Sequence, residues 1–426
     1  MNTREQMTRE HNWADNYTFS AARIHRPASL DEVRRLVARS PHIRAIGARH
    51  SFNEIADSPG ELIDVGGIDP DFVIDPERRT VAVGAGTSYG VLASYLHKAR
   101  WTLHNMASLP HVSVAGAVAT GTHGSGDRLG NLSSAVAALE LVTAAGDLVT
   151  IRRGDPDFDG TVVALGALGI VTRVTLDIEP AFEMRQDAYE GLPWDTVLSD
   201  FDAVMSVGYS VSLMTSWSEP TVTRLWIKTK LADRAQEAAS VAHLGTTPTA
   251  HPLARPTPEA MARFNPFGVP GPGFERLPHF RSDAEPGPAG HLQSEYMVPR
   301  AQATAAIAKI RALGNRIDLH LWATEIRSMA GDKLWLSPAY GTDCVGIHFS
   351  WLREPEVVDK LTVEIEAMLL PLGGRPHWGK IMHTRADRLT PLYPQLPAFR
   401  DLVRSYDPGE KFRNEFLERH VLGIEP

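Results

Sequence analysis

The sequence feature that most constrains the fold is a nearly uncharged run of small residues at positions 105–126, NMASLPHVSVAGAVATGTHGSG. The run lacks large apolar side chains at helical spacing, so it does not predict a good amphipathic helix. Its glycines, serines and threonines suit a backbone that lies close to an extended polar ligand. The run therefore predicts a ligand-binding segment, and the alternative is a Gly/Ala-rich loop packed against the core.

A second stretch, GARHSFN at positions 47–53, follows an apolar run at 43–46 that is typical of a short buried strand. A turn at Gly47 and Ala48 then places His50 and Ser51 at the end of that strand. Such a turn lets backbone N–H groups approach a phosphate, and the Ser51 hydroxyl adds a donor. Alone, the stretch is more typical of a turn with a surface histidine, but the two stretches together favour a binding site.

Composition excludes several classes of function. The chain has 426 residues, which is long enough for two domains, and its 43% hydrophobic and 22% charged residues are typical of a soluble globular protein. The formal net charge of -8 argues against a nucleic-acid or anionic-membrane partner. The single cysteine, Cys344, rules out an internal disulfide and a cysteine-rich metal site.

The N-terminal segment is polar and charged and contains no apolar signal core. No apolar run reaches the length of a membrane span. We therefore expect a soluble cytoplasmic protein, and we expect it to be a monomer.

Local patterns predict a mixture of short helices and strands in the first 180 residues. Ser29 followed by Glu32 is a capping-box pattern, which predicts a helix over about 30–39. The remaining predicted elements are strands at 61–65 and 80–84, a helix ending near residue 100, a hairpin within 140–151, and a short helix and a strand within 162–178. This mixture is typical of an α+β nucleotide-binding domain.

The pattern changes after about residue 181. The predicted elements are paired strands at 211–217 and 221–228, a Pro/Gly-rich loop at 247–290, a helix at 301–313, strands at 317–327 and 345–351, and a helix that continues to 372. This second region is the expected substrate domain.

Two of these strands place charged and polar side chains where chemistry could occur. Strand alternation puts Glu325 and Arg327 on one face with Leu319, Leu321 and Ala323. A carboxylate and a guanidinium on a partly buried face need each other or a polar ligand.

His348 and Ser350 share a face of the other strand, opposite Val345, Ile347, Phe349 and Trp351. The two polar pairs predict one site lined by a sheet, and two separate structural clusters are an equal alternative.

Two other kinds of site match the sequence poorly. Residues 374–380, GRPHWGK, fit the spacing of a phosphate-binding loop, but Ile381 stands where such a loop needs serine or threonine. The 17 histidines suggest a metal hydrolase, but no H-E-x-x-H or similar helical pair occurs. We therefore expect neither an ATPase nor a metal site.

Six segments spread along the chain point to one family. They are GARHSFN at 47–53, NMASLPH at 105–111, GTHGSG at 121–126, TEIR at 324–327, HFSW at 348–351 and HWGK at 377–380. Together they resemble the vanillyl-alcohol-oxidase-like flavoproteins, and among them the bacterial alditol oxidases. The resemblance implies a two-domain α+β fold, with an FAD-binding domain at 1–180, a substrate-binding domain of sheet and helices at 181–374, and a segment at 375–426 that returns to the FAD domain.

The resemblance also implies FAD as the cofactor, bonded through His50 to the flavin 8α-methyl. Many relatives have glycine just before this histidine, where this chain has Arg49. The positions that match FAD contacts of the family are Ile46, Gly47, Ala48, Arg49, His50, Ser51, Ser108, Ser113, Val114, Gly116, Thr120, Gly121, Thr122, His123, Gly169, Val171 and His377.

The resemblance further implies that an alditol such as xylitol or sorbitol is oxidised at its terminal hydroxyl to the aldose, with oxygen reduced to hydrogen peroxide. The expected substrate-binding residues are Ser108, Glu325, Arg327, His348, Ser350 and Lys380, of which Glu325, Arg327 and Lys380 are expected to be catalytic. Arg327 and Lys380 would stabilise the developing alkoxide, and only Lys380 would also accept a proton. The alternatives are an aldonolactone oxidase or dehydrogenase of the same family and, from other classes, a non-enzymatic flavin carrier and a metal hydrolase.

Overall fold

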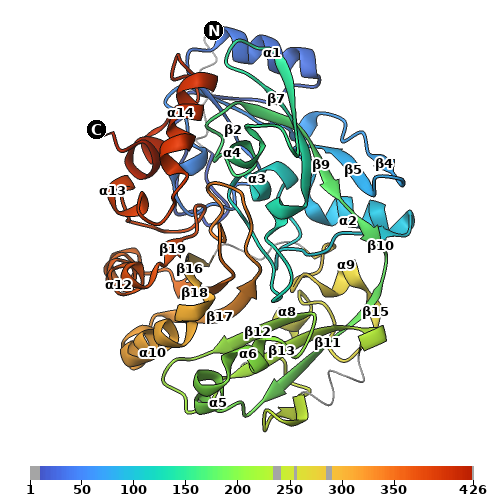
Figure 1. The fold of residues 1–426 in the computed structure, drawn as a ribbon, viewed down its shortest axis with the longest axis vertical. Helices are drawn as coiled ribbons and strands as arrows, with labels where there is room; N and C mark the ends of the chain where they lie inside the picture. The colour runs from blue at the N-terminus through green and yellow to red at the C-terminus, as the bar shows by residue number, and fades with distance from the viewer. Residues whose placement is uncertain (1–9, 234–240, 254–256, 285–289, 425–426) are drawn as a thin grey trace, which may run out of the picture.

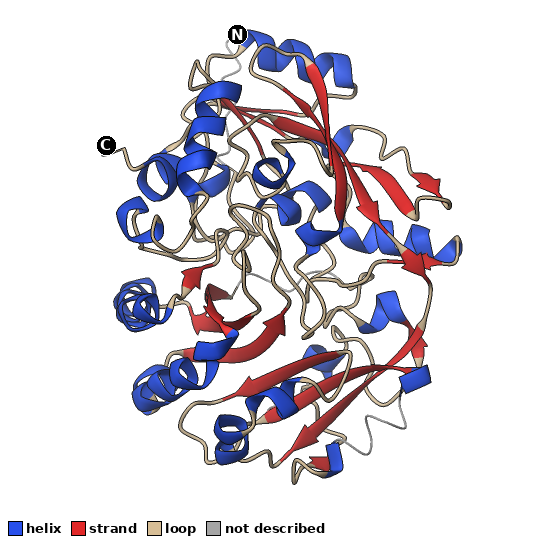
Figure 2. Cartoon of the chain, viewed as in Figure 1, coloured by secondary structure: helices blue, strands red, loops and turns tan. Residues whose placement is uncertain are grey.

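The computed structural model describes residues 10–233, 241–253, 257–284 and 290–424. An N-terminal part built on small sheets faces a second part built on one large antiparallel sheet (Figure 1). Loops fill the region where the two parts meet (Figure 2). Helices and strands are mixed throughout both parts, as an α+β fold predicts.

The N-terminal part contains a parallel sheet in the order β1-β3-β2 and an antiparallel sheet in the order β4-β5-β9-β7-β8. Its strands are β1 (Arg23–His25), β2 (Ile43–Ala45), β3 (Glu61–Ile63), β4 (Val73–Asp75), β5 (Thr80–Gly84), β6 (Trp101–Thr102), β7 (Val136–Val142), β8 (Leu148–Arg152), β9 (Ile170–Asp177) and β10 (Glu179–Pro180). Its helices are α1 (Leu30–Arg39), α2 (Tyr89–Lys98), α3 (Val114–Ala119) and α4 (Phe158–Thr161).

Most of the predicted elements of this part are confirmed. Helix α1 occupies the predicted range, and the Ser29 side chain accepts a hydrogen bond from the Glu32 backbone N–H at its start. Strands β7 and β8 form the predicted hairpin. The short helix predicted within 162–178 is wrong: α4 ends at Thr161, before that range, and the positive φ angles of Leu165, Gly166 and Gly169 are incompatible with a helix there.

The large sheet has the order β14-β11-β13-β12-β17-β18-β16-β19, with β15 paired to β11. Its strands are β11 (Glu183–Glu190), β12 (Ser210–Thr215), β13 (Arg224–Lys230), β14 (Thr247–Pro248), β15 (Gly271–Pro272), β16 (His291–Pro299), β17 (Leu321–Met329), β18 (Cys344–Leu352) and β19 (Arg375–Pro376). The helices of this region are α5 (Trp194–Ser199), α6 (Phe201–Met205), α8 (Pro258–Met261), α9 (Gly273–Arg276), α10 (Ala303–Leu313), α11 (Asn315–Asp318) and α12 (Pro355–Leu369).

The two faces of this sheet have different roles. On one face, Ile347, Phe349 and Trp351 join a buried apolar core with side chains from α5, α6, α10 and α12. Because side chains alternate along a strand, His348 and Ser350 lie on the opposite face, which looks toward the N-terminal part. The predicted division of β18 into an apolar face and a polar face is confirmed.

The sequence patterns misplaced three elements of this region. Residues predicted to begin a strand at 317 form α11, whose Asp318 carboxylate accepts backbone N–H groups of Trp217 and Ser218. Strand β17 therefore begins only at Leu321, and Leu319 is 75% exposed instead of sharing the Glu325 face. Strand β16 was not predicted at all, and the loop predicted at 247–290 contains short helices and strands.

The C-terminal residues pack against the N-terminal part (Figure 1). They form α13 (Ala386–Leu389), α14 (Leu396–Tyr406) and α15 (Glu415–Leu417). Trp378, Phe399 and Phe416 belong to the same apolar core as Val83 and Leu92. The boundaries at 180 and 374 remain predictions. None of the described helices is both long and apolar enough to cross a lipid bilayer.

Candidate active site

A cavity of about 540 Å³ lies between the two parts of the molecule. One wall, the loop wall, is made by residues 47–51 and 105–126. The opposite wall, the strand wall, is made by β16, β17 and β18. The segment at 377–380 closes one side, so four regions that are distant in sequence meet at one site.

The loop wall places His50 at the cavity. Its Nδ1 lies 2.8 Å from the Ala48 carbonyl oxygen, and its buried Nε2 has no hydrogen-bond partner among the described residues. Burial lowers the pKa of His50 to about 4, so the imidazole is neutral near pH 7. The indole of Trp13 stacks on this ring with centroids 5.0 Å apart. His50 is therefore fixed in place with one unsatisfied ring nitrogen.

Arg49 takes a backbone conformation that favours glycine. Its φ angle is +61°, in the left-handed region. Its guanidinium forms an ion pair with Glu10, and its carbonyl accepts a hydrogen bond from the Trp13 N–H. The departure from glycine at this position is thus accommodated by contacts with the N-terminal segment.

The small-residue run supplies the rest of the loop wall. It contains α3, so it is not a loop throughout, but this helix is only 6 residues long. Gly47 and Gly116 lie against the Ser113 hydroxyl, where a side chain at either glycine would clash. This close packing holds the two segments of the loop wall against each other, and ligand binding by the run stays a prediction.

The candidate residues are divided between the cavity lining and the layer behind it. Those on the lining are Gly47, Ala48, Arg49, His50, Ser51, Ser108, Ser113, Gly116, Thr120, Thr122, His123, His377, Glu325, Arg327, His348, Ser350 and Lys380. Those behind it are Ile46, Val114, Gly121, Gly169 and Val171, which pack in apolar cores or in turns. These five residues could contact a cofactor in the cavity only through their backbone atoms.

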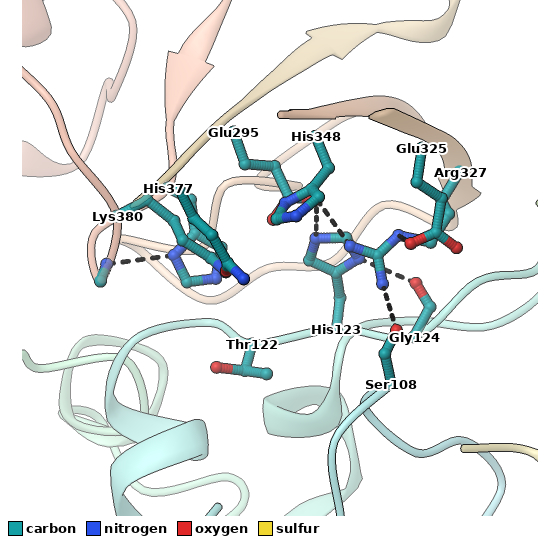
Figure 3. A network of polar contacts seen from close by, with 12 residues as sticks. Ser108, Thr122, His123, Gly124, Glu295, Glu325, Arg327, His348, His377 and Lys380 are labelled. Atoms are coloured by element: carbon teal, nitrogen blue, oxygen red, sulfur yellow. Dashed lines mark hydrogen bonds and ion pairs between the residues drawn. The ribbon is translucent and has the colours of Figure 1, made fainter. Parts of the chain in front are cut away.

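The strand wall contains an ion-pair network centred on Arg327 (Figure 3). Arg327 Nη2 donates to Glu295 Oε1 at 2.7 Å, Nη1 donates to Ser108 Oγ at 3.2 Å, and Nε lies 3.5 Å from Glu325 Oε2. The two carboxylates raise the pKa of Arg327 although burial opposes them. The guanidinium thus stays charged and oriented toward the loop wall.

Glu295 connects this network to the loop wall. It is only 2% exposed, and its carboxylate lies 3.1 Å from His123 Nε2 and 3.4 Å from His348 Nδ1. Burial alone would raise the pKa of Glu295, but His123, Arg327 and His348 together hold it well below its usual range. Glu295 is therefore an anion shared by both walls.

Glu325 lies on the other side of Arg327. Its Oε1 lies 3.4 Å from His279 Nε2. Burial would raise its pKa, but Arg327, His279 and His348 lower it to about 2. Lys228 is also buried nearby and donates to the Leu277 carbonyl oxygen, and burial lowers its pKa to about 7.

Lys380 is a partly buried cation of the cavity lining whose hydrogen-bond partner is neutral. Its Nζ donates to the neutral Gln293 amide oxygen, and no ion pair of Lys380 occurs among the described residues. The ammonium also lies 5.2 Å from the centroid of the Phe52 ring. Burial lowers its pKa to about 8, even though Glu295 opposes the shift. Lys380 is therefore able to change protonation state near neutral pH.

Three functional-site residues were missed by sequence reasoning. Glu295 and Gln293 lie on β16, which was not predicted, and His279 lies in the region predicted as a loop. The alternation of polar Gln293 and Glu295 with Leu292 and Tyr296 was a strand signal that could have found two of them.

Two family models match separate regions of the chain. A model described as FAD binding domain matches residues 21–152. A model described as D-arabinono-1,4-lactone oxidase matches residues 290–420. The first match includes the His50 loop and the whole small-residue run, and the second includes the whole strand wall.

Whole-chain comparisons agree with these matches. An alditol oxidase from Streptomyces sp. is 44% identical over 409 residues, which cover 95% of this chain and 97% of the relative. An L-gulono-1,4-lactone dehydrogenase from Mycobacterium tuberculosis is 28% identical over 430 residues, which cover 97% of this chain and 98% of the relative.

The crystal structure of cholesterol oxidase from B. sterolicum superposes with a TM-score of 0.78 at 17% identity, covering 97% of this chain and 96% of that one. At that identity the superposition supports the fold alone, and it agrees with the predicted two-domain α+β class. The sequence match to the Streptomyces protein goes further, because it is high and nearly complete. The chain therefore belongs to the alditol oxidase-like family of FAD-dependent oxidoreductases.

Proposed function

We propose that this protein binds FAD covalently through His50 and oxidises the terminal hydroxyl of an alditol such as xylitol or sorbitol to the aldose, with oxygen reduced to hydrogen peroxide. The observation that supports this best is that Arg327, Glu325 and Lys380 face the His50 loop across one cavity. The 44% identity to an alditol oxidase supports the same substrate class. A cytoplasmic, monomeric protein remains part of this proposal.

The loop wall fits FAD. The unpartnered Nε2 of the buried His50 leaves a nucleophilic ring nitrogen in the cavity, and Gly47 and Gly116 let the two segments of the loop wall pack closely on the Ser113 hydroxyl. Bound FAD supplies the hydride acceptor and the redox connection to oxygen. The chain itself has to bind the polyol, orient its terminal carbon and remove a proton.

The strand wall fits those tasks. Ser108, Ser350 and Glu325 offer hydroxyl and carboxylate groups to the hydroxyls of a flexible chain. Arg327 keeps its charge near the developing alkoxide. Lys380, with a pKa of about 8, accepts the hydroxyl proton at Nζ when it is neutral.

A lactone oxidase or dehydrogenase is the second candidate, because the lactone oxidase family model matches residues 290–420. A sugar lactone is also uncharged and rich in hydroxyls. A linear chain reaches the groups of each strand in turn, whereas a lactone presents its hydroxyls around a rigid ring. The identity of 44% against 28% favours the alditol.

The test compares kcat/KM and peroxide release for xylitol, sorbitol, glycerol and galactono-1,4-lactone. We expect an alditol to be preferred and one peroxide to form per alditol oxidised. Preference for the lactone over every alditol would overturn the substrate assignment. Alditol oxidation with a dye acceptor but without peroxide in air would overturn the assignment of oxygen as acceptor.

A further inference from the structure

A β-bulge in β17 turns one tryptophan toward the cavity. The register between β17 and β18 shifts between Leu321 and Ala323, so Trp322 has no paired residue on β18. Bulges redirect side chains and are frequent next to active sites. The Trp322 indole stacks on the His291 imidazole, with ring centroids 5.3 Å apart and an interplanar angle of 6°. Trp322 lines the cavity and yet is 60% exposed.

His291 connects this tryptophan to the catalytic groups. His291, Gln293 and Glu295 occupy alternate positions on β16 and all line the cavity. His291 Nε2 lies 2.9 Å from Gln293 Nε2, and Gln293 accepts a hydrogen bond from Lys380. His291 and Gln293 are partly exposed, whereas Glu295 is buried. This face of β16 thus runs from the cavity mouth to its floor.

A third ring completes the mouth. The Trp13 indole meets the His291 ring edge-on, with centroids 5.6 Å apart, while it stacks on His50. We call Trp13, His291 and Trp322 the aromatic mouth. Because Trp322 is held on one side by His291 and is largely exposed, it offers an ordered apolar surface to a ligand in the cavity.

The face of β16 that lines the cavity is longer than a simple alditol. His291 and Glu295 are separated by four residues along a strand, which corresponds to about 13 Å. An extended pentitol or hexitol is shorter than this distance. A simple alditol whose terminal carbon lies near Arg327, beside Glu295, would therefore span this face only in part and leave Trp322, at its outer end, free for a further group of the substrate.

We propose that the aromatic mouth is a second carbohydrate subsite, which binds the sugar ring of a glycosylated alditol while its open-chain end reaches Lys380. This inference rests on the proposed alditol oxidation. A pyranose ring has a face of C–H groups that packs against an indole, and its hydroxyls remain in water at the ring edge. The exposed Trp322 matches the first requirement, and the open mouth matches the second.

The test compares sorbitol with maltitol, which is sorbitol carrying a glucosyl group. In Trp322→Ala we expect kcat/KM for maltitol to fall about three- to tenfold, which is the strength of an aromatic contact, mainly through KM. The kcat/KM for sorbitol should stay within about twofold of the wild-type value, because sorbitol lacks the sugar ring that would contact Trp322. Trp322→Phe keeps a ring and should restore most of the loss.

Leu319→Ala is the matched control, because Leu319 is an exposed apolar residue just before β17 that does not line the cavity. This variant should leave kcat/KM unchanged for both sorbitol and maltitol. If Trp322→Ala lowers kcat/KM equally for sorbitol and maltitol, or if the wild-type protein neither oxidises maltitol nor is competitively inhibited by it, the subsite is wrong while the proposed function stands. If sorbitol and xylitol are not oxidised at all, the proposed function fails and the subsite fails with it.

Discussion

The loop wall and the strand wall hold their polar groups in different ways. On the loop wall, small residues pack two segments closely together, and the ring of His50 keeps an unsatisfied nitrogen. On the strand wall, the charged groups of Glu295, Glu325 and Arg327 are already paired with one another. A wall with open groups is suited to receive a large cofactor, whereas a wall with balanced buried charges is suited to keep them oriented for chemistry.

The largest expected effect comes from the loop wall. His50→Ala should release the flavin completely, because no other side chain is proposed to bond the 8α-methyl. Wild-type protein precipitated with acid should stay yellow, and the variant should leave its flavin in the supernatant. His111→Ala is the matched control, since His111 also lines the cavity. Flavin that washes out of the acid-treated wild type would show that the histidyl bond is absent.

Variants of the charged residues that face the His50 loop should show the opposite behaviour: they should lose the rate of flavin reduction but keep the flavin bound. Arg327→Met or Lys380→Met should slow flavin reduction by roughly 10²–10³, since each removes a charged donor from a desolvated site. Anaerobic stopped-flow reduction by xylitol measures this, and absorbance measures bound flavin. Lys360→Met, which changes an exposed lysine, is the control. Unchanged reduction in both site variants would remove these residues from the mechanism.

The difference between the walls also explains what the sequence could predict. Each segment of the loop wall carries a local pattern, GARHSFN at 47–53 and the small residues at 105–126, although the contact of Gly47 with Ser113 joins the two segments over a long range. The strand wall instead depends on partners that are distant in sequence, such as Glu295 and Arg327, which are 32 residues apart. Strand alternation identified the correct faces of Glu325 and His348. It could not identify Glu295, which lies on a third strand and contacts both Arg327 and His348.

Two further features depend on backbone geometry that residue types do not encode. An arginine at φ +61° is not predictable from the residue itself, because few non-glycine residues adopt that region. The bulge at Trp322 is likewise set by the register of β17 on β18 and not by a local pattern. The first feature depends on contacts with Glu10 and Trp13, and the second depends on the pairing of β17 with β18.

The pH dependence should separate the two cations of the strand wall. If neutral Lys380 accepts the proton, flavin reduction should fall about tenfold per pH unit below its pKa of about 8 and level off above it. Lys380→Arg keeps a positive charge but cannot lose it, so this limb should disappear in the variant. A wild-type rate that is constant between about pH 6 and 9 would exclude Lys380 as the proton acceptor.

Glu295 offers a way to perturb both walls at once. Glu295→Gln keeps the shape of the side chain but removes the charge that Arg327 and His123 share. Loss of a charge-assisted hydrogen bond should slow flavin reduction by roughly tenfold. Because the effect acts through the charged partners, the pH profile should shift as well. A normal rate with an unchanged pH profile would mean that Glu295 serves only the packing of the sheet.

The smallest expected effect concerns Arg49, where the loop wall departs from glycine. Arg49→Gly relieves a left-handed conformation that costs about 1 kcal/mol for a non-glycine residue. It also removes the partly exposed ion pair with Glu10 and makes the unfolded chain more flexible, and these two losses are of similar size. The unfolding free energy should therefore change by less than about 1 kcal/mol, and the flavin should remain bound.

Arg49→Ala separates these contributions, because alanine loses the ion pair but keeps the unfavourable φ angle. We expect the alanine variant to be less stable than the glycine variant by about 1 kcal/mol in denaturant unfolding. If alanine is instead the more stable of the two, the strain at this position is negligible, because both variants lack the ion pair with Glu10 and differ only in backbone freedom. The loop wall would then accept a non-glycine residue just before His50 without a cost in backbone free energy.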